Sequence, residues 1–145
     1  MLSTMERVLF LRSVDIFSDV AGEDLAPLAM VADEARFGRG ETVLRSGDPG
    51  EELYVIVAGE IGVIAPTGEQ IAQRGPGKVI GEMAVFSGRP RSATCVALSE
   101  VVALRLLRED VLEMLAERPA LAVGMIQVLT ERLDEATQLL ALGGA

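Results

Sequence analysis

The sequence predicts an α+β fold that is mainly β, an antiparallel jelly roll or β-barrel with helices at both ends of the chain. Three observations favour this class. Residues 34–107 hold short β-type runs separated by glycines, which is typical of tight hairpins. Helical periodicity precedes and follows this region. A single break in the β pattern, at residues 82–86, suits one helical turn inserted into the barrel.

Two helices are expected in residues 1–33, before the barrel. Residues 3–13 carry apolar side chains in a short amphipathic pattern, and residues 24–32 give a second, shorter pattern. Neither segment contains the run of about 18 apolar residues that a membrane span requires, and no later segment does. We therefore expect a soluble, unprocessed chain in the cytoplasm, without direct membrane contact.

The barrel region consists of short strands joined by turns. The expected strands cover residues 43–44, 53–58, 61–65, 71–73, 79–80, 94–98 and 101–106. Glycines recur between them, from Gly38 to Gly75, and supply the conformations that tight hairpin turns need. Many short strands with glycine turns are typical of a small antiparallel barrel or jelly roll.

Helical periodicity returns over residues 108–142. The pattern predicts one helix over residues 108–117 and a longer one over residues 119–142, with Pro119 in its first turn, where a missing N–H is tolerated. The longer helix has an apolar stripe on one side. This stripe consists of Leu121, Met125, Val128, Ala136 and Leu139.

Length and charge limit the classes of function. The 145 residues, half of them hydrophobic, predict a single domain, residues 1–145, with enough apolar material for a core. The net charge is −9, and no basic stripe is present. A partner nucleic acid is therefore not expected, because binding it requires clustered Lys and Arg that neutralise phosphates.

The missing residue types restrict the chemistry further. The chain has no His, which removes Ser-His-Asp and Cys-His catalytic systems and His-rich metal sites. The single Cys95 cannot form an internal disulfide and is expected as a small buried residue of a strand, in a reducing compartment. Residues 75–78 (Gly-Pro-Gly-Lys) lack the spacing of a phosphate loop and are expected to form a turn. We expect no catalytic residues, no metal site and no enzymatic activity.

The most informative segment is residues 81–94, where Glu82 and Arg91 stand nine residues apart with small residues beside each. Gly81 lets the backbone turn without a Cβ penalty, and residues 82–86 can form a helical turn whose free N–H groups attract anions. Arg91 offers a planar fork of donors that matches two phosphate oxygens. Glu82 would repel a phosphate, so a sugar hydroxyl is its natural partner. The implied ligand therefore carries ribose and phosphate. The alternative is that Glu82 and Arg91 bind no ligand and only form an ion pair with each other on a loop.

The string G-E-M-A-x-F-S-G-x-P-R-S-A-T at residues 81–94 closely resembles the phosphate-binding cassette of the cyclic nucleotide-binding domain family. The resemblance extends from roughly Phe17 to Leu140. It implies a regulatory module that senses cAMP or cGMP, with no other cofactor, and transmits binding through its C-terminal helices. Both nucleotides are expected to bind, with cAMP slightly preferred. Similarity to channel-type members points to the regulatory tail of a larger membrane channel or transporter as the parent.

The resemblance also implies roles for the residues that meet phosphate and sugar. Glu82 takes the ribose 2′-hydroxyl, and Arg91 takes the exocyclic phosphate oxygens. The backbone amides of Ala84 and Ala93 bind the same phosphate. Ser92 can offer its hydroxyl to the phosphate or to a guanine amino group.

The remaining expected contacts surround the sugar and the base. Gly81 and Met83 shape the sugar pocket by the same resemblance, although a methionine at position 83 would also suit the core. Val79 and Ile80, just before the cassette, are the expected apolar support for the purine. Together with the cassette residues, they form the predicted binding site.

Arg132 falls in the middle of the apolar stripe of the last helix. In channel-type members a long basic residue on this helix covers the base, so Arg132 is the candidate lid, with its guanidinium stacked on the purine. The structural alternative is an arginine that snorkels to solvent and pairs with Glu135.

Two other classes of function stay open. A jelly-roll domain can keep this fold, bind no nucleotide and serve in assembly. A carboxylate-based enzyme is the third class, but the sequence places no second acidic residue near Glu82 and shows no cluster of metal ligands.

Overall fold

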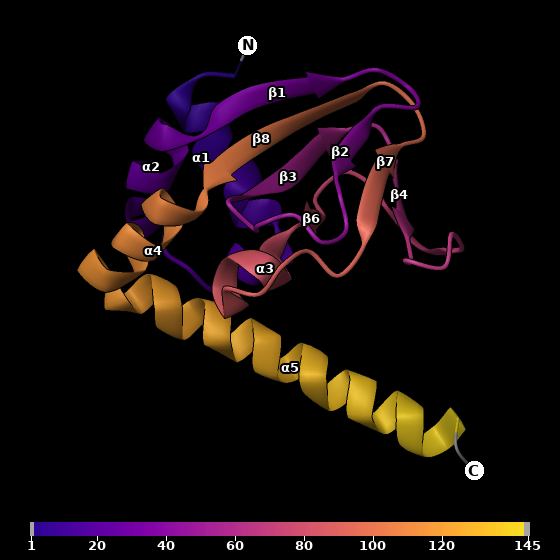
Figure 1. Cartoon of the computed structure of the whole chain (residues 1–145). Helices are drawn as coiled ribbons and strands as arrows, with labels where there is room; N and C mark the ends of the chain where they lie inside the picture. Colours follow the sequence, from indigo (N-terminus) through magenta and orange to yellow (C-terminus); the bar gives the residue numbers. More distant parts are fainter. Residues whose placement is uncertain (1, 144–145) are drawn as a thin grey trace.

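The computed structural model describes residues 2–143, except for the side chains of residues 15, 132, 135, 136, 139 and 142 (Figure 1). It confirms the predicted jelly roll, since two four-stranded antiparallel sheets form its centre. One sheet has the order β1 (Asp33–Phe37), β8 (Val101–Leu107), β3 (Glu52–Ala58) and β6 (Val79–Ile80). The other has the order β2 (Thr42–Leu44), β7 (Thr94–Ala97), β4 (Ile61–Ile64) and β5 (Gln70–Arg74).

The helices lie outside the two sheets, at one end and along one side. They are α1 (Thr4–Ser13), the 3-10 turn η1 (Asp15–Phe17), α2 (Gly22–Val31), α3 (Glu82–Ser87), α4 (Arg108–Glu117) and α5 (Pro119–Gly143). Figure 1 shows α1, α2 and α4 gathered at one end of the barrel, with α3 beside β6. Ser3 caps α1 in a capping box with Glu6, which satisfies backbone N–H groups that the first turn leaves free. No helix in the described part of the chain is long and apolar enough to cross a bilayer.

Two clusters of buried side chains hold these elements together. In the first, Leu11 and Leu25 of the N-terminal helices pack with Leu104 of β8 and with other side chains of both sheet and helices. The second cluster lies between the sheets and includes Ile56 and Ile61. Burial of apolar area on this scale is the main stabilising contribution to the fold.

Strand β1 is the strand that the sequence analysis missed. Its segment Asp33–Phe37 contains three charged residues and therefore has no apolar run. It pairs with β8 along its whole length, and Arg105 of β8 forms an ion pair of 3.3 Å with Asp33. Pairing with a neighbouring strand, rather than composition, determines this edge strand.

Among the described side chains of helix α5, those that are buried against the body lie in its first half. Leu121, Met125 and Val128 are buried, as the apolar stripe predicts. Beyond them the helix extends away from the barrel (Figure 1), and Leu133 and Leu140 are 69% and 77% exposed. The predicted stripe therefore describes the anchored half, while the second half also carries apolar side chains that face solvent.

Candidate functional site

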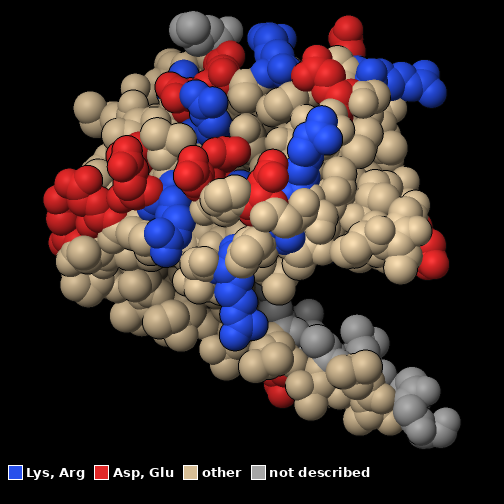
Figure 2. Space-filling model, in the orientation of Figure 1, with Lys and Arg blue, Asp and Glu red and all other residues tan. Residues whose placement is uncertain are grey.

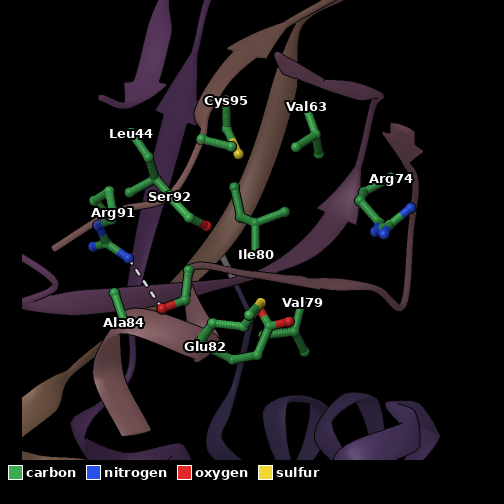
Figure 3. Close-up of a pocket in the computed structure, with 13 residues that line it drawn as sticks. Leu44, Val63, Arg74, Val79, Ile80, Glu82, Ala84, Arg91, Ser92 and Cys95 are labelled. Carbon is green, nitrogen blue, oxygen red and sulfur yellow. Dashed lines mark hydrogen bonds between the residues drawn. The ribbon is translucent and has the colours of Figure 1, made fainter. Parts of the chain in front are cut away.

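A pocket opens where β6 runs into α3, and the segment after α3 closes one side of it (Figure 3). Nine of the ten predicted site residues line this pocket. They are Val79, Ile80, Gly81, Glu82, Met83, Ala84, Arg91, Ser92 and Ala93. Residues from β6, α3 and the following segment are thus brought together, as the sequence analysis predicted.

Gly81 makes the turn between β6 and α3. Its φ of +84° lies in the left-handed region, which a residue with a Cβ adopts only at a cost. A Cβ at this position would also lie 2.5 Å from Nη1 of Arg91 and 3.1 Å from the carbonyl oxygen of Glu52. Position 81 therefore has to be glycine both for the turn and for the close approach of the arginine.

Arg91 is the one charged residue buried among those the structure describes, with 5% of its surface exposed. Its Nη1 donates to the carbonyl of Gly81 (3.0 Å), and its Nη2 donates to the carbonyl of Glu52 (2.5 Å). The Glu52 carboxylate lies 3.7 Å from Nη2. The Arg91 backbone is fixed too, because its N–H donates to Asp48 and its carbonyl accepts from Gly47, each at 2.8 Å.

These contacts fix the guanidinium before any ligand arrives. A guanidinium has five N–H donors, and two are used by the carbonyls of Gly81 and Glu52. The others can serve an anion in the pocket. The structure pairs Arg91 with the carboxylate of Glu52 on β3, an acid partner that the sequence analysis did not consider.

The floor of the pocket comes from one row of paired strands. Cys95 of β7 lies opposite Leu44 of β2 and opposite Val63 of β4, and directly opposed residues present their side chains on the same face. All three line the pocket, with Val79 and Ile80 of β6. The result is an apolar surface of the kind that supports a planar base.

The electrostatics of the pocket are visible at Cys95. Burial raises the pKa of its thiol to about 11, and the negative charge of Glu82 adds to this effect. The positive charges of Arg91 and Arg74 act in the opposite direction. The predicted buried Cys95 is confirmed, and its neutral thiol contributes an apolar surface to the pocket at neutral pH.

Four lining residues were not predicted. They are Leu44, Val63, Arg74 and Cys95. All four lie on strands. The alternation of apolar and polar residues along a strand shows which side chains share a face of the sheet, but not which strand lies alongside or in which register, so one sequence cannot place these residues in the pocket.

Met83 is 70% exposed and lines the pocket, so the alternative that it belongs to the core is wrong. The Arg132 side chain lies outside the described residues, and its role as a lid stays a prediction.

A sequence profile of the cyclic nucleotide-binding domain matches residues 34–118, more than half of the chain. The chain belongs to the cyclic nucleotide-binding domain family. The match begins in β1 and ends one residue after α4, so the pocket and the cassette lie inside it. As a member of this family, the chain is a regulatory ligand-binding domain, and the resemblance seen in residues 81–94 is confirmed.

Individual relatives agree with this assignment. The chain is 32% identical to a CRP-like cAMP-activated global transcriptional regulator of Mycobacterium tuberculosis, over 87% of this chain and 58% of the regulator. It is 36% identical to a cyclic nucleotide-gated potassium channel of Mesorhizobium japonicum, over 57% of this chain and 22% of the channel. The structure matches the N-terminal domain of a transcriptional regulator from Streptomyces coelicolor A3(2), with a TM-score of 0.76, 33% identity and coverage of 89% and 95%.

The chain spans little more than half the length of the regulator it matches, and a smaller part of the channel. Cyclic nucleotide-binding domains thus occur among its relatives in both transcription regulators and a channel. The comparisons do not favour a channel or transporter, which the sequence analysis expected as the parent protein, over a transcription regulator.

Proposed function

We propose that this domain binds a cyclic purine mononucleotide, cAMP or cGMP, as a regulatory ligand. The observation that carries the proposal is the buried guanidinium of Arg91, held by two backbone carbonyls in the same pocket as Glu82. A buried, oriented arginine is suited to a single small anion. Residues 1–145 act as one such binding unit, without catalytic activity of their own.

Each lining residue has a role in this proposal. Arg91 binds the exocyclic phosphate oxygens, and the amides of Ala84 and Ala93 bind the same phosphate. Glu82 accepts a hydrogen bond from the ribose 2′-hydroxyl, which a carboxylate does well. Gly81 and Met83 border the sugar.

The base occupies the apolar part of the pocket. Val79 and Ile80 support one of its faces, and Ser92 faces the phosphate or a guanine amino group. Arg132, one turn beyond Val128, covers the base when the second half of α5 folds over the pocket. Binding then favours the closed arrangement of α5, and this population shift is the signal.

The closed arrangement of α5 would act on a larger protein. Relatives of this chain are longer and include a transcription regulator and a channel, so the effector lies in the part of the protein beyond the domain. The domain carries a net charge of −9 and has an acidic surface around α4, which disfavours direct contact with nucleic acid (Figure 2).

A second candidate is a jelly-roll domain that serves assembly and binds no nucleotide. The observation that favours it is the apolar surface of α5, where Ile126, Leu133 and Leu140 are well exposed. Large exposed apolar side chains in a row mark surfaces that contact a partner. The two candidates differ in one measurable property, the affinity for cyclic nucleotides.

Calorimetry against cAMP, cGMP, cyclic dinucleotides, ATP and 5′-AMP tests the proposal. We expect cyclic mononucleotides to bind and to raise the melting temperature, and ATP and 5′-AMP to do so far less, because the pocket suits a singly charged cyclic phosphate. Equal shifts with 5′-AMP contradict the cyclic-phosphate assignment. No binding of any cyclic nucleotide favours the assembly domain.

A further inference from the structure

A second pocket lies between the loop that joins β2 to β3, the segment after α3 and the start of α4. It measures about 300 Å³ and shares only Ala84 with the nucleotide pocket. Arg89 and Arg108 line it, and Glu51 is the one acidic residue among the described residues of its wall. The proposed nucleotide site uses neither arginine, so the second pocket offers positive charge to a different ligand.

Arg108 is held in this pocket by two backbone carbonyls. Its N–H donates to the carbonyl of Glu51 (2.7 Å), and its Nε donates to the carbonyl of Val85 in α3 (2.8 Å). Within the described part of the chain, it forms no ion pair. The two terminal nitrogens, which carry four of the five N–H donors of a guanidinium, are therefore oriented without an acid partner.

Two glycines bring the walls of the second pocket close together. A Cβ at Gly88 would lie 3.4 Å from Nη2 of Arg108, so a glycine leaves room for the guanidinium there. A Cβ at Gly50 would lie 2.3 Å from the Cβ of Ala84, so the loop after β2 packs its backbone directly against α3. The charged group and the walls beside it are thus in place before a ligand binds.

These donors are suited to an oxyanion. Arg108 presents a planar fork that matches two oxygens of one anion, and the exposed Arg89 adds a second positive charge. Two arginines against one carboxylate give the described wall a net positive charge, although the whole chain carries −9. A dianion gains more than a monoanion from such a wall, because the Coulomb energy rises with the charge of the ligand.

We propose that the second pocket binds a dianionic phosphate, either inorganic phosphate or the phosphate of a small monoester. This site goes beyond the proposed function, because it needs neither Arg91 nor the nucleotide pocket. A cyclic nucleotide has a singly charged phosphate, which the proposed function gives to Arg91. The two pockets therefore take phosphates of different charge, with Ala84 of α3 on the wall of both.

The test titrates inorganic phosphate by calorimetry at fixed ionic strength, so that screening is the same throughout. One titration uses the parent saturated with cAMP, and another uses Arg91→Ala protein without nucleotide. Each keeps phosphate off the Arg91 guanidinium, and the second does not depend on the proposed function. Glycerol 3-phosphate and acetate, titrated in the same way, represent a phosphate monoester and a monoanion.

Arg108→Gln is the decisive variant. The glutamine amide nitrogen is as many bonds from Cα as Nε of arginine, so it can still donate to the Val85 carbonyl while the charged fork is lost. Arg39→Gln is the matched control, because it removes the same charge from the turn between β1 and β2, outside the second pocket. Arg89→Gln is a second test that leaves the contact with Val85 untouched.

We expect Arg108→Gln to weaken phosphate binding by about 10- to 150-fold, the loss for charge-assisted hydrogen bonds to one anion. Arg89→Gln should weaken it by about two- to fivefold, as for an exposed charge, and Arg39→Gln by less than about twofold. Glu51→Gln should strengthen it, because a carboxylate on the same wall repels the anion. Binding of glycerol 3-phosphate that is also lost in Arg108→Gln supports the site and extends it to monoesters.

Three results would overturn the proposal. The first is equal weakening in Arg108→Gln and Arg39→Gln, which leaves only attraction to the overall charge. The second is no phosphate binding by the cAMP-saturated parent and none by Arg91→Ala protein. The third is acetate bound as tightly as phosphate. Failure of the parent to bind any cyclic nucleotide overturns the proposed function alone, because phosphate binding to Arg91→Ala protein that depends on Arg108 still supports the second pocket.

Discussion

Replacing Gly81 by alanine should disturb the phosphate site without removing any side chain from it. The new Cβ would lie 2.5 Å from Nη1 of Arg91, far inside van der Waals contact, and 3.1 Å from the Glu52 carbonyl oxygen. The backbone carbonyl cannot yield easily, so the guanidinium has to move and loses its bonds to the two carbonyls. Hydrogen bonds of a charged donor contribute about 1.5–3 kcal/mol. The left-handed φ of +84° adds about 1–2 kcal/mol for a residue with a Cβ.

Gly77→Ala is the matched control. Gly77 has the same φ of +84°, but nothing lies within 4 Å of the Cβ that alanine would add. This variant therefore bears only the backbone cost, and Gly77 is not among the residues that line the pocket. The difference between the two variants isolates the collision with the guanidinium.

Urea unfolding and calorimetry together measure both effects. We expect Gly77→Ala to lose about 1–2 kcal/mol of stability with unchanged nucleotide affinity. Gly81→Ala should lose a further 1.5–3 kcal/mol, roughly, and bind cyclic nucleotide at least about tenfold more weakly. Equal stability and equal affinity of the two variants would refute the reasoning, because the Arg91 guanidinium would then not be held where the structure places it.

Three further predictions concern other groups of the same region. Arg91→Ala should weaken cyclic nucleotide binding by about 30- to 1000-fold in calorimetry. It should also lower the stability of the free protein in urea by about 1–3 kcal/mol, because the carbonyls of Gly81 and Glu52 lose their donor. Unchanged affinity would show that the cassette assignment is wrong. The pKa of Cys95 is raised from 9.0 to about 11, so between these values the folded state keeps a proton that the unfolded state releases, and stability should fall as the pH rises from 9 to 11. Cys95→Ala should remove up to about 2–3 kcal/mol of that fall. Parallel profiles of stability against pH for the parent and the variant would contradict this prediction. Arg132→Ala should cost about 0.5–2 kcal/mol of binding if Arg132 is the lid, mostly as faster dissociation of a fluorescent cyclic nucleotide, and an unchanged dissociation rate would reject the lid.

The sequence could predict the parts of the fold that depend on local pattern. The glycine turns and apolar runs placed seven strands within one or two residues at each end, and α4 was predicted with its observed bounds, Arg108–Glu117. The inserted helix follows from Gly81 and the small residues after it. These features are encoded within a few neighbouring residues, which is why a single sequence reveals them.

The rest depends on contacts between distant segments. Strand β1 is defined by its pairing with β8, about 70 residues later in the chain, and its own residues are too polar to indicate a strand. The carbonyl of Glu52 that holds Arg91 is 39 residues away from it. The two are brought together by the pairing of β3 with β6 and by the backbone bonds of Arg91 to Gly47 and Asp48. Arg74 reaches the pocket because β5 pairs with β4 in one register, and a shift of one residue would turn it outward.

The way α5 is attached has a mechanical consequence. Among the described side chains, Val128 is the last of three buried anchors, and beyond it the helix extends away from the barrel (Figure 1). From Leu129 to Gly143 the helix rises by roughly 22 Å, at 1.5 Å for each residue. A tilt of about 10° at the last anchor would therefore displace the tip by about 4 Å. The second half of α5 is a lever arm, and small changes in packing at Met125 and Val128 are enlarged at its far end.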